Sequence, residues 1–311
     1  MEIVNCELCG ANDTELVYEE KDRLHGVEGT FDLVRCQQCG LMYLSPRPTS
    51  EEMRRYYPGS YGPHQPIHEG SSRFARLEQW HGVRKLSRAV IAQSQMERGR
   101  VLDIGCSTGA FLDAMRRQGW EPYGLDTNVA AVRYAREHRE LDVFAGRLQE
   151  AEYPSDFFDV VTLWNVFEHL HHPRVTLAEI GRVIQRKGLL VISIPNPDSL
   201  EARVFGRYWA GLDAPRHLYL FSRHTLERLL ALTGFELQDV RSFTGHHPVL
   251  ALSMGFWLDE KVDSDRWRRC MKATVESLAV RVLTLPYYAI ADRVNQSSVM
   301  TVFARRRKEL E

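Results

Sequence analysis

Four of the six cysteines form two short motifs with the spacing of a metal site. They are Cys6 and Cys9, in the sequence Cys-Glu-Leu-Cys-Gly, and Cys36 and Cys39, in the sequence Cys-Gln-Gln-Cys-Gly. In such a turn the two thiolates converge, because the small glycine allows backbone amides to turn toward sulfur. Two turns supply the four soft ligands of a tetrahedral zinc site, and with all four positions filled by protein the predicted zinc is structural. Redox or disulfide pairs are the alternative.

A second motif places carboxylates beside a glycine turn. The segment from Val101 through Asp103 reads as a buried strand, Gly105-x-Ser107-x-Gly109 follows as a turn, and a helix comes next. About 20 residues further on, another strand ends in an acid, Asp126, where a nucleotide ribose would offer two hydroxyls. We therefore expect a mononucleotide-type α/β fold.

The charge of this turn constrains the cofactor. A dinucleotide site needs Gly-x-Gly-x-x-Gly and amides directed at a pyrophosphate, and Asp103 would repel that pyrophosphate. The same carboxylate suits a cofactor with a positive methionine-like amino group and a sulfonium. No Lys-Ser/Thr pair follows the turn, which disfavours a nucleotide-triphosphate loop.

The surrounding elements divide the 311 residues into more than one module. Strand-like runs around the cysteines predict a zinc ribbon over residues 1–48. Residues 49–98 read as a helical connector, with an amphipathic helix from Arg73, and residues 99–308 as the cofactor-binding domain. Cys106 and Cys270 are isolated, and we interpret both as packing residues.

The C-terminal part predicts a closing pair of strands, at residues 236–243 and 298–305, separated by an insertion at residues 245–297. We expect the insertion to form helices that cover the active-site mouth or make a homodimer contact. Its apolar helix lies near Arg266, Arg268, Arg269 and Lys272, so peripheral contact with a membrane or a lipid-linked substrate is a further interpretation.

Charge and hydropathy exclude several classes of protein. The net charge is −1 and 44% of residues are hydrophobic, which is typical of a globular chain and disfavours disorder and wholesale nucleic-acid coating. Residues 1–60 carry 6 basic and 11 acidic side chains, whereas residues 266–311 carry 10 and 4. The first residues form neither a basic nor an apolar signal region, so we expect a cytoplasmic protein.

With these motifs the sequence resembles the class I S-adenosylmethionine-dependent methyltransferases, in the small-molecule branch that carries an N-terminal zinc ribbon. Besides the cysteines, the turn and Asp126, the resemblance rests on the runs at residues 158–170, 187–196, 213–218 and 229–235. It implies a Rossmann-like sheet with a closing antiparallel hairpin, S-adenosylmethionine as cofactor and methyl transfer as activity. Ser107, where the family often has glycine, and Gly146-Arg147-Leu148, where many relatives place an acid for the adenine amino group, depart from the pattern.

The resemblance also implies roles for individual residues. Asp103 would lie near the amino end of the cofactor, Asp126 would accept from the ribose hydroxyls, and Leu148 would pack on adenine. The full predicted cofactor set is Asp103, Gly105, Cys106, Ser107, Gly109, Asp126, Thr127, Leu148, Asn165 and Val166.

Two histidines are candidates for the base that a hydroxyl acceptor would need. His169 follows the fourth strand and His217 lies in the loop after the fifth, and both are expected at the carboxyl edge of the sheet. For each, a loop histidine hydrogen-bonded to backbone is the structural alternative.

Together these observations predict a methyltransferase acting on a small molecule, with O-methylation of a sugar, a cell-surface glycan or a secondary-metabolite precursor as the expected reaction. No nucleic-acid partner is expected, because the ribbon is acidic. A zinc-ribbon RNA methyltransferase and a non-catalytic cofactor-binding scaffold are the alternatives. The sequence does not identify the acceptor.

Overall fold

The computed structural model describes residues 1–58, 73–242 and 247–307, with side chains from residue 80 onward in the second range. These residues form two compact units. The first combines Met1–Tyr56, Ile194–Leu226 and Val240–Thr301, and the second combines Tyr57–Ser193, Glu227–Asp239 and the segment that begins at Val302. These two units divide the chain differently from the predicted domains, whose boundaries lie at residues 48 and 98. Those domain boundaries stay predictions. Residues 59–72 of the predicted connector, residues 245–246 of the insertion and Lys308 lie outside the described residues.

A seven-stranded sheet forms the centre of the second unit, in the order β10-β11-β8-β7-β4-β5-β6. Its parallel strands are β4 (Arg100–Ile104), β5 (Glu121–Asp126), β6 (Asp142–Ala145), β7 (Phe158–Trp164) and β8 (Ile184–Pro195). From β4 the chain proceeds outward to β6 and then returns to the other side of β4 at β7. Ligand sites of open α/β sheets lie at such a reversal, outside the carboxyl ends of the strands.

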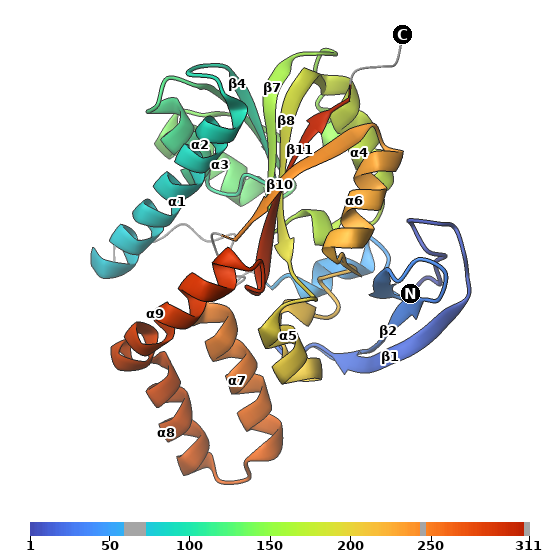
Figure 1. Cartoon of the computed structure of the whole chain (residues 1–311), viewed down its shortest axis with the longest axis vertical. Coiled ribbons are helices and arrows are strands. Elements are labelled where there is room, and N and C mark those ends of the chain that lie inside the picture. Colours follow the sequence, from blue (N-terminus) through green and yellow to red (C-terminus); the bar gives the residue numbers. More distant parts are fainter. Residues whose placement is uncertain (59–72, 243–246, 308–311) are drawn as a thin grey trace. The chain divides into compact units, whose positions relative to one another are not determined.

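The central strands are apolar on both faces, as parallel strands covered by helices must be. Val101 and Leu102 of β4 and Val160, Val161 and Leu163 of β7 are fully buried. Figure 1 shows α1 (Arg73–Ser94), α2 (Ala110–Arg116) and α3 (Val129–Arg139) on one face of the sheet and α4 (Pro173–Val183) on the other. The predicted helix from Arg73 is confirmed as α1.

The closing hairpin is also present. In the sheet, β11 (Val299–Arg306) lies between β8 and β10 (Phe235–Arg241). The amide of Arg307 donates to the carbonyl of Gly234, so the end of β11 meets the start of β10 and the two strands are antiparallel. Helix α6 (Arg223–Leu232) precedes β10.

The first unit contains a four-stranded antiparallel sheet, β1-β2-β3-β9. The first three strands are those of the predicted ribbon, namely β1 (Thr14–Lys21), β2 (Thr30–Cys36) and β3 (Met42–Leu44). The fourth, β9 (Tyr219–Leu220), was not predicted and pairs Tyr219 with Tyr43 of β3. A short turn of 3₁₀ helix, Glu52–Tyr56, follows the ribbon.

A buried ion network joins the ribbon to the segment before β9. The guanidinium of Arg216 donates to Asp22 at 2.8 Å, to both carboxylate oxygens of Asp213 and to the backbone carbonyl of Tyr56. The side chains of Arg216 and Asp22 are fully buried. Asp22 also accepts the amides of Leu24, His25 and Val27, so one carboxylate orders a ribbon turn and receives the distant guanidinium.

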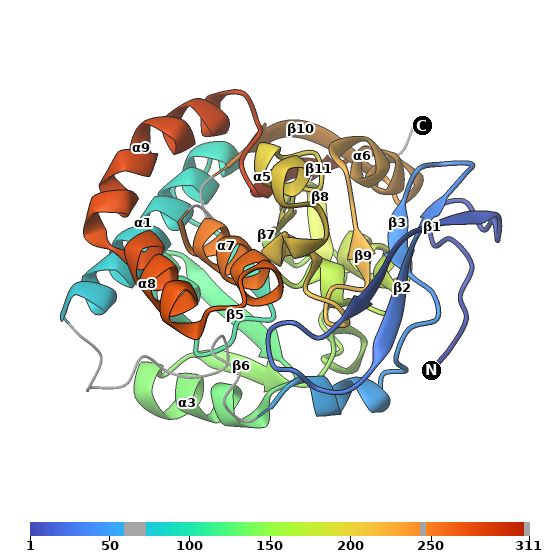
Figure 2. The same cartoon turned by 90° about the horizontal axis from the view of Figure 1, so that it is seen from below.

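Helices complete the first unit. The described part of the insertion forms α7 (His247–Lys261), α8 (Asp265–Glu276) and α9 (Leu278–Arg293), which confirms that it is helical. Figure 2 shows α7 and α8 side by side, with α9 continuing from α8. Shorter elements are α5 (Leu200–Phe205) and the 3₁₀ turns Gly206–Tyr208 and Ala210–Leu212. Among the described residues, none of the helices combines the length and the apolar character that crossing a bilayer requires.

The two isolated cysteines differ in their surroundings. Cys106 is buried, as expected of a packing residue, and its Sγ would lie 2.8 Å from a Cβ placed on Gly124. Cys270 is exposed on α8, so the interpretation that it packs in a core is wrong. An isolated cysteine in an amphipathic segment gives no sign of which face it occupies.

Candidate active site and metal centre

The turn after β4 contacts the turn after β7 through one glycine and one valine. Gly105 has a φ of +75°, and a Cβ on it would lie 2.4 Å from Cγ2 of Val166. A Cβ on Gly109, at a φ of +76°, would likewise meet Leu141 at 2.4 Å. Both glycines are therefore required by packing within the protein, before any cofactor is considered.

The carboxylate of Asp126 holds the turn in place from the end of the neighbouring strand. Its Oδ2 accepts the amide of Ser107 at 2.8 Å, and its Oδ1 accepts the amide of Asn128 at 2.7 Å. Each oxygen keeps a lone pair for one further donor, so the buried carboxylate can accept two vicinal hydroxyls. Ser107 itself has a φ of +49°, which explains why glycine is common at this position.

Asp103 is a buried carboxylate on β4 with one hydrogen-bond donor. The hydroxyl of Thr162 on β7 donates to its Oδ1 at 2.7 Å. Burial raises the pKa of Asp103 to about 8, and the charge of Asp126 adds to the rise while the Thr162 hydrogen bond opposes it. Because both carboxylates stand near one turn, a positively charged ligand group would fit this site and a pyrophosphate would not.

The remaining predicted cofactor residues differ in exposure. Leu148 is buried in a 3₁₀ turn, Leu148–Glu150, while Thr127 and Asn165 are exposed. Asn165 has a φ of +52°, a conformation that asparagine tolerates better than most residues. Val166 is half-buried beside Gly105. All the residues of the predicted cofactor set belong to the second unit.

One acidic side chain near this set was missed. The sequence has no acid directly after β6, but the carboxylate of Glu150 folds back and accepts the amide of Arg147 at 2.8 Å. Its Oε2 would lie 2.6 Å from a Cβ placed on Gly146. The residue three positions before Glu150 is arginine and not the serine or threonine of a capping box, so no local sequence signal predicts this position.

His169 lies in the 3₁₀ turn Phe167–His169, which follows β7. Its Nδ1 is 3.1 Å from the hydroxyl of Tyr57, and the two rings pack edge to face. Tyr57 was not among the predicted site residues, and its separation from His169 by 112 positions in the sequence leaves no local signal.

His217 belongs to the first unit, in the segment between the last 3₁₀ turn and β9. Its Nδ1 lies 2.8 Å from the carbonyl oxygen of Gly211, and a carbonyl only accepts, so Nδ1 carries a proton. Burial lowers the pKa of His217, although the charge of Asp213 opposes this effect. The neutral ring therefore has its lone pair on Nε2.

The four predicted metal ligands converge at one end of the ribbon sheet. Their sulfur atoms all lie within 4.8 Å of one another, with 3.4 Å between Cys6 and Cys39 and 3.5 Å between Cys9 and Cys36. Thiolates at the zinc–sulfur distance of about 2.3 Å in a tetrahedron are about 3.8 Å apart. The arrangement therefore fits a zinc ion.

The two cysteine turns have the same backbone geometry. Gly10 donates to the carbonyl of Cys6 and Gly40 to that of Cys36, and both glycines have a φ of +78°. Although burial opposes it, hydrogen bonds from the amides of Cys39 and Gln38 lower the pKa of the Cys36 thiol to about 7. Amides directed at sulfur stabilise thiolates, as a metal centre requires.

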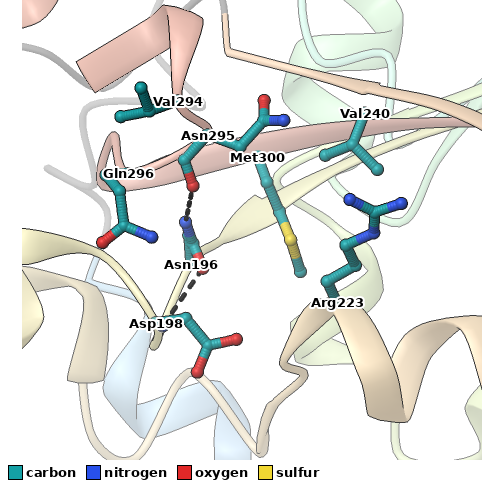
Figure 3. Close-up of a pocket in the computed structure, with 8 residues that line it drawn as sticks. All are labelled: Asn196, Asp198, Arg223, Val240, Val294, Asn295, Gln296 and Met300. Atoms are coloured by element: carbon teal, nitrogen blue, oxygen red, sulfur yellow. Dashed lines mark hydrogen bonds between the residues drawn. The ribbon is translucent and has the colours of Figure 1, made fainter. Parts of the chain in front are cut away.

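A separate cavity of about 220 Å³ lies in the first unit (Figure 3). The side chain of Asn196 donates to the carbonyls of Asn295 and Ser297 and so fastens the end of β8 to the chain entering β11. The lining is formed by Asn196, Asp198, Arg223, Val240, Val294, Asn295, Gln296 and Met300. None of the predicted site residues lines this cavity.

Comparison with known proteins agrees with the geometry. A family model described as "Methyltransferase domain" matches residues 74–240, more than half of the chain. The mitochondrial ubiquinone biosynthesis O-methyltransferase of Schizosaccharomyces pombe is 35% identical over 30% of this chain and 37% of its own length. The malonyl-[acyl-carrier protein] O-methyltransferase of Paenibacillus sp. is 29% identical over 49% of this chain and 64% of its own length. The chain thus spans less than two thirds of the length of these relatives.

Two solved structures share the fold. The [4+2]-cyclase SpnF has a TM-score of 0.52 at 19% identity, covering 84% of this chain and 97% of its own. A chain of the Haloferax volcanii complex that contains the Trm112 methyltransferase activator has a TM-score of 0.51 at 17% identity, covering 77% and 95%. These likenesses concern the fold alone. With the family match, the parallel sheet and the glycine turn after β4, this chain belongs to the class I S-adenosylmethionine-dependent methyltransferases.

Proposed function

We propose that this protein transfers the methyl group of S-adenosylmethionine to a hydroxyl of a small molecule, such as a sugar, a cell-surface glycan or a secondary-metabolite precursor. The observation that carries the proposal is the Gly105 turn, held by Asp126 beside the buried Asp103. Two relatives named O-methyltransferases support an oxygen acceptor.

In this proposal the second unit binds the cofactor through charge and shape. Asp103 would pair with its amino group, the open lone pairs of Asp126 would accept from the ribose hydroxyls, and Leu148 would contact adenine. Glu150 is added as the acceptor for the adenine amino group. Bound there, the cofactor supplies a methyl carbon activated by a sulfonium. The protein then contributes chiefly by holding the acceptor in line with that carbon.

The two histidines are proposed as alternative bases. His217 has its Nδ1 proton fixed by Gly211, so its Nε2 can accept a proton from a hydroxyl. His169 could do the same only when its Nδ1–H donates to Tyr57. If His169 is the base, Tyr57→Phe should lower kcat, because the Tyr57 hydroxyl then no longer favours the tautomer of His169 that carries its proton on Nδ1.

The four cysteines are proposed to hold a structural zinc ion that orders the ribbon, and the acceptor is proposed to be a small molecule and not RNA. The acidic excess of residues 1–60 supports the second point, because RNA binding relies on basic surfaces.

The test uses methyl-labelled S-adenosylmethionine with the purified protein and small-molecule extracts. We expect labelled product, formed with S-adenosylhomocysteine and lost in Asp103→Asn. Cofactor binding in calorimetry without turnover on any extract would favour a scaffold. Label transfer to RNA, with binding that weakens steeply as salt rises, would refute the small-molecule acceptor.

A further inference from the structure

Helix α9 exposes its apolar side and turns its polar side inward. Five of its large apolar side chains are between 54% and 75% exposed. They are Leu278, Val282, Leu283, Leu285 and Ile290. At 100° per residue, these positions and the exposed Ala279, Pro286 and Ala289 cover about half of the helix circumference.

The opposite side of α9 faces the rest of the first unit. Tyr288 and Ala291 are buried there, and the polar side chains of Thr284 and Asp292 are half-buried. Asp292 accepts the hydroxyl of Ser297 at 2.6 Å, which fixes the end of the helix. The usual pattern of a surface helix is therefore reversed. The apolar face ends at the exposed Arg293, the last residue of the helix. An apolar face of this extent marks an interaction surface.

The preceding helix, α8, contacts α9 and carries several basic side chains. Lys272 and Arg268 are held in ion pairs with Asp259 and Asp265. Arg266 and Arg269 are exposed and form no ion pair with any residue that the structure describes. Between them Trp267 is 64% exposed. Unpaired guanidiniums flanking an exposed tryptophan are typical of segments at the boundary of a membrane.

We propose that α8 and α9 dock on the surface of an anionic membrane, with the apolar face of α9 in the acyl boundary and Arg266 and Arg269 on lipid headgroups. The 16 residues of α9 extend about 24 Å, less than the roughly 30 Å of a hydrocarbon core, and Pro286 interrupts the helix. The helix is therefore suited to lying in the interface.

Charge favours a membrane over a second copy of the chain. A symmetric dimer places the same patch of both copies together, so the unpaired guanidiniums of α8 would approach their own counterparts. Anionic headgroups pair with those guanidiniums instead. The proposal does not depend on methyl transfer.

Vesicle flotation of the full-length protein tests the proposal, with phosphatidylcholine vesicles that contain or lack phosphatidylglycerol. Wild-type protein should float with the anionic vesicles. The double variant Leu278→Gln/Leu283→Gln should bind them about tenfold or more weakly, because two apolar side chains are lost. Arg266→Gln/Arg269→Gln should lower the affinity for anionic vesicles about thirtyfold and leave the affinity for neutral vesicles unchanged.

Matched controls sit on α4. Val175 is 56% exposed and Arg174 is exposed. Val175→Gln and Arg174→Gln therefore replace an exposed apolar and an exposed basic side chain outside α8 and α9, and they should leave flotation unchanged. Circular dichroism and binding of S-adenosylmethionine should be equal in all variants. The proposal is overturned if wild-type protein stays in the soluble fraction, or if the leucine variant floats like wild type. It is equally overturned if that variant only converts a dimer into a monomer.

Discussion

Replacing Asp103 with asparagine separates the stability of the second unit from its affinity for the cofactor. In the folded protein burial raises the pKa of Asp103 to about 8, whereas an unfolded aspartate titrates near 3.9. The stability associated with Asp103 is therefore fully present below about pH 4 and is lost as pH rises toward 8. An asparagine at this position would keep the hydrogen bond from Thr162 without this titration.

The size of the effect follows from the two pKa values. Keeping Asp103 protonated in the fold costs about 4 kcal/mol at pH 7 and about 1 to 2 kcal/mol at pH 5. The buried amide group of asparagine adds a cost of its own, about 1 to 3 kcal/mol, which is the same at both pH values. The stability of Asp103→Asn relative to wild type should therefore rise by about 2 to 3 kcal/mol between pH 5 and pH 7.

The assay is urea unfolding at the two pH values, followed by hydrogen exchange of peptides that cover β4 and β7. Asp142→Asn is the control, because Asp142 is exposed at the start of β6 in the same sheet, and its relative stability should not change between the two pH values. Calorimetry at pH 7 should show S-adenosylmethionine binding about tenfold or more weakly to Asp103→Asn, because asparagine, unlike Asp103, cannot ionise when the positively charged amino group of the cofactor binds. A relative stability that is equal at pH 5 and pH 7 would refute the inference that Asp103 is held protonated.

Three further changes test other parts of the structure. Cys36→Ser should reduce the zinc content from about one ion per chain, as expected for a four-thiolate site, while Cys270→Ser on α8 should leave it unchanged; equal zinc in both variants by elemental analysis would contradict the site. Arg216→Met should destabilise the first unit by about 3 to 5 kcal/mol, because Asp22 is left charged and buried, and adding Asp22→Asn should restore part of the loss in thermal denaturation. Gly105→Ala should cost about 1 to 3 kcal/mol more than Gly119→Ala, since both have positive φ but only Gly105 faces a side chain at 2.4 Å; equal losses would show that the contact with Val166 is not limiting.

Local patterns predicted most of the candidate site. The cysteine turns and the turn after β4 are each defined within a few residues, so their spacing alone indicates their geometry. The predicted sheet and its closing hairpin are likewise runs of apolar or alternating residues. The boundaries of strands differ from the predicted ones where a strand extends into a turn. β8, for example, begins at Ile184 and contains Lys187 at a φ of +65°.

Contacts between distant segments were not predictable. The pair formed by Arg216 and Asp22 spans 194 residues, and Tyr57 and His169 are 112 apart. β9 has two residues, too few for any periodicity. The sequence suggested a membrane contact for this apolar helix but did not decide whether its apolar side chains are exposed, because an apolar run looks the same in sequence whether it faces a core or solvent.

The late position of Arg216 and β9 affects the order in which the protein can be completed during synthesis. All four cysteines precede Arg216 by more than 170 residues, so their thiols leave the ribosome earlier and can capture zinc before Arg216 is made. Asp22 receives its guanidinium, and β3 its last neighbour, only after about 180 further residues have been made. Until then the nascent ribbon holds an unpaired carboxylate and an open sheet edge. Metal capture would therefore keep this region ordered while the rest of its unit is still being translated.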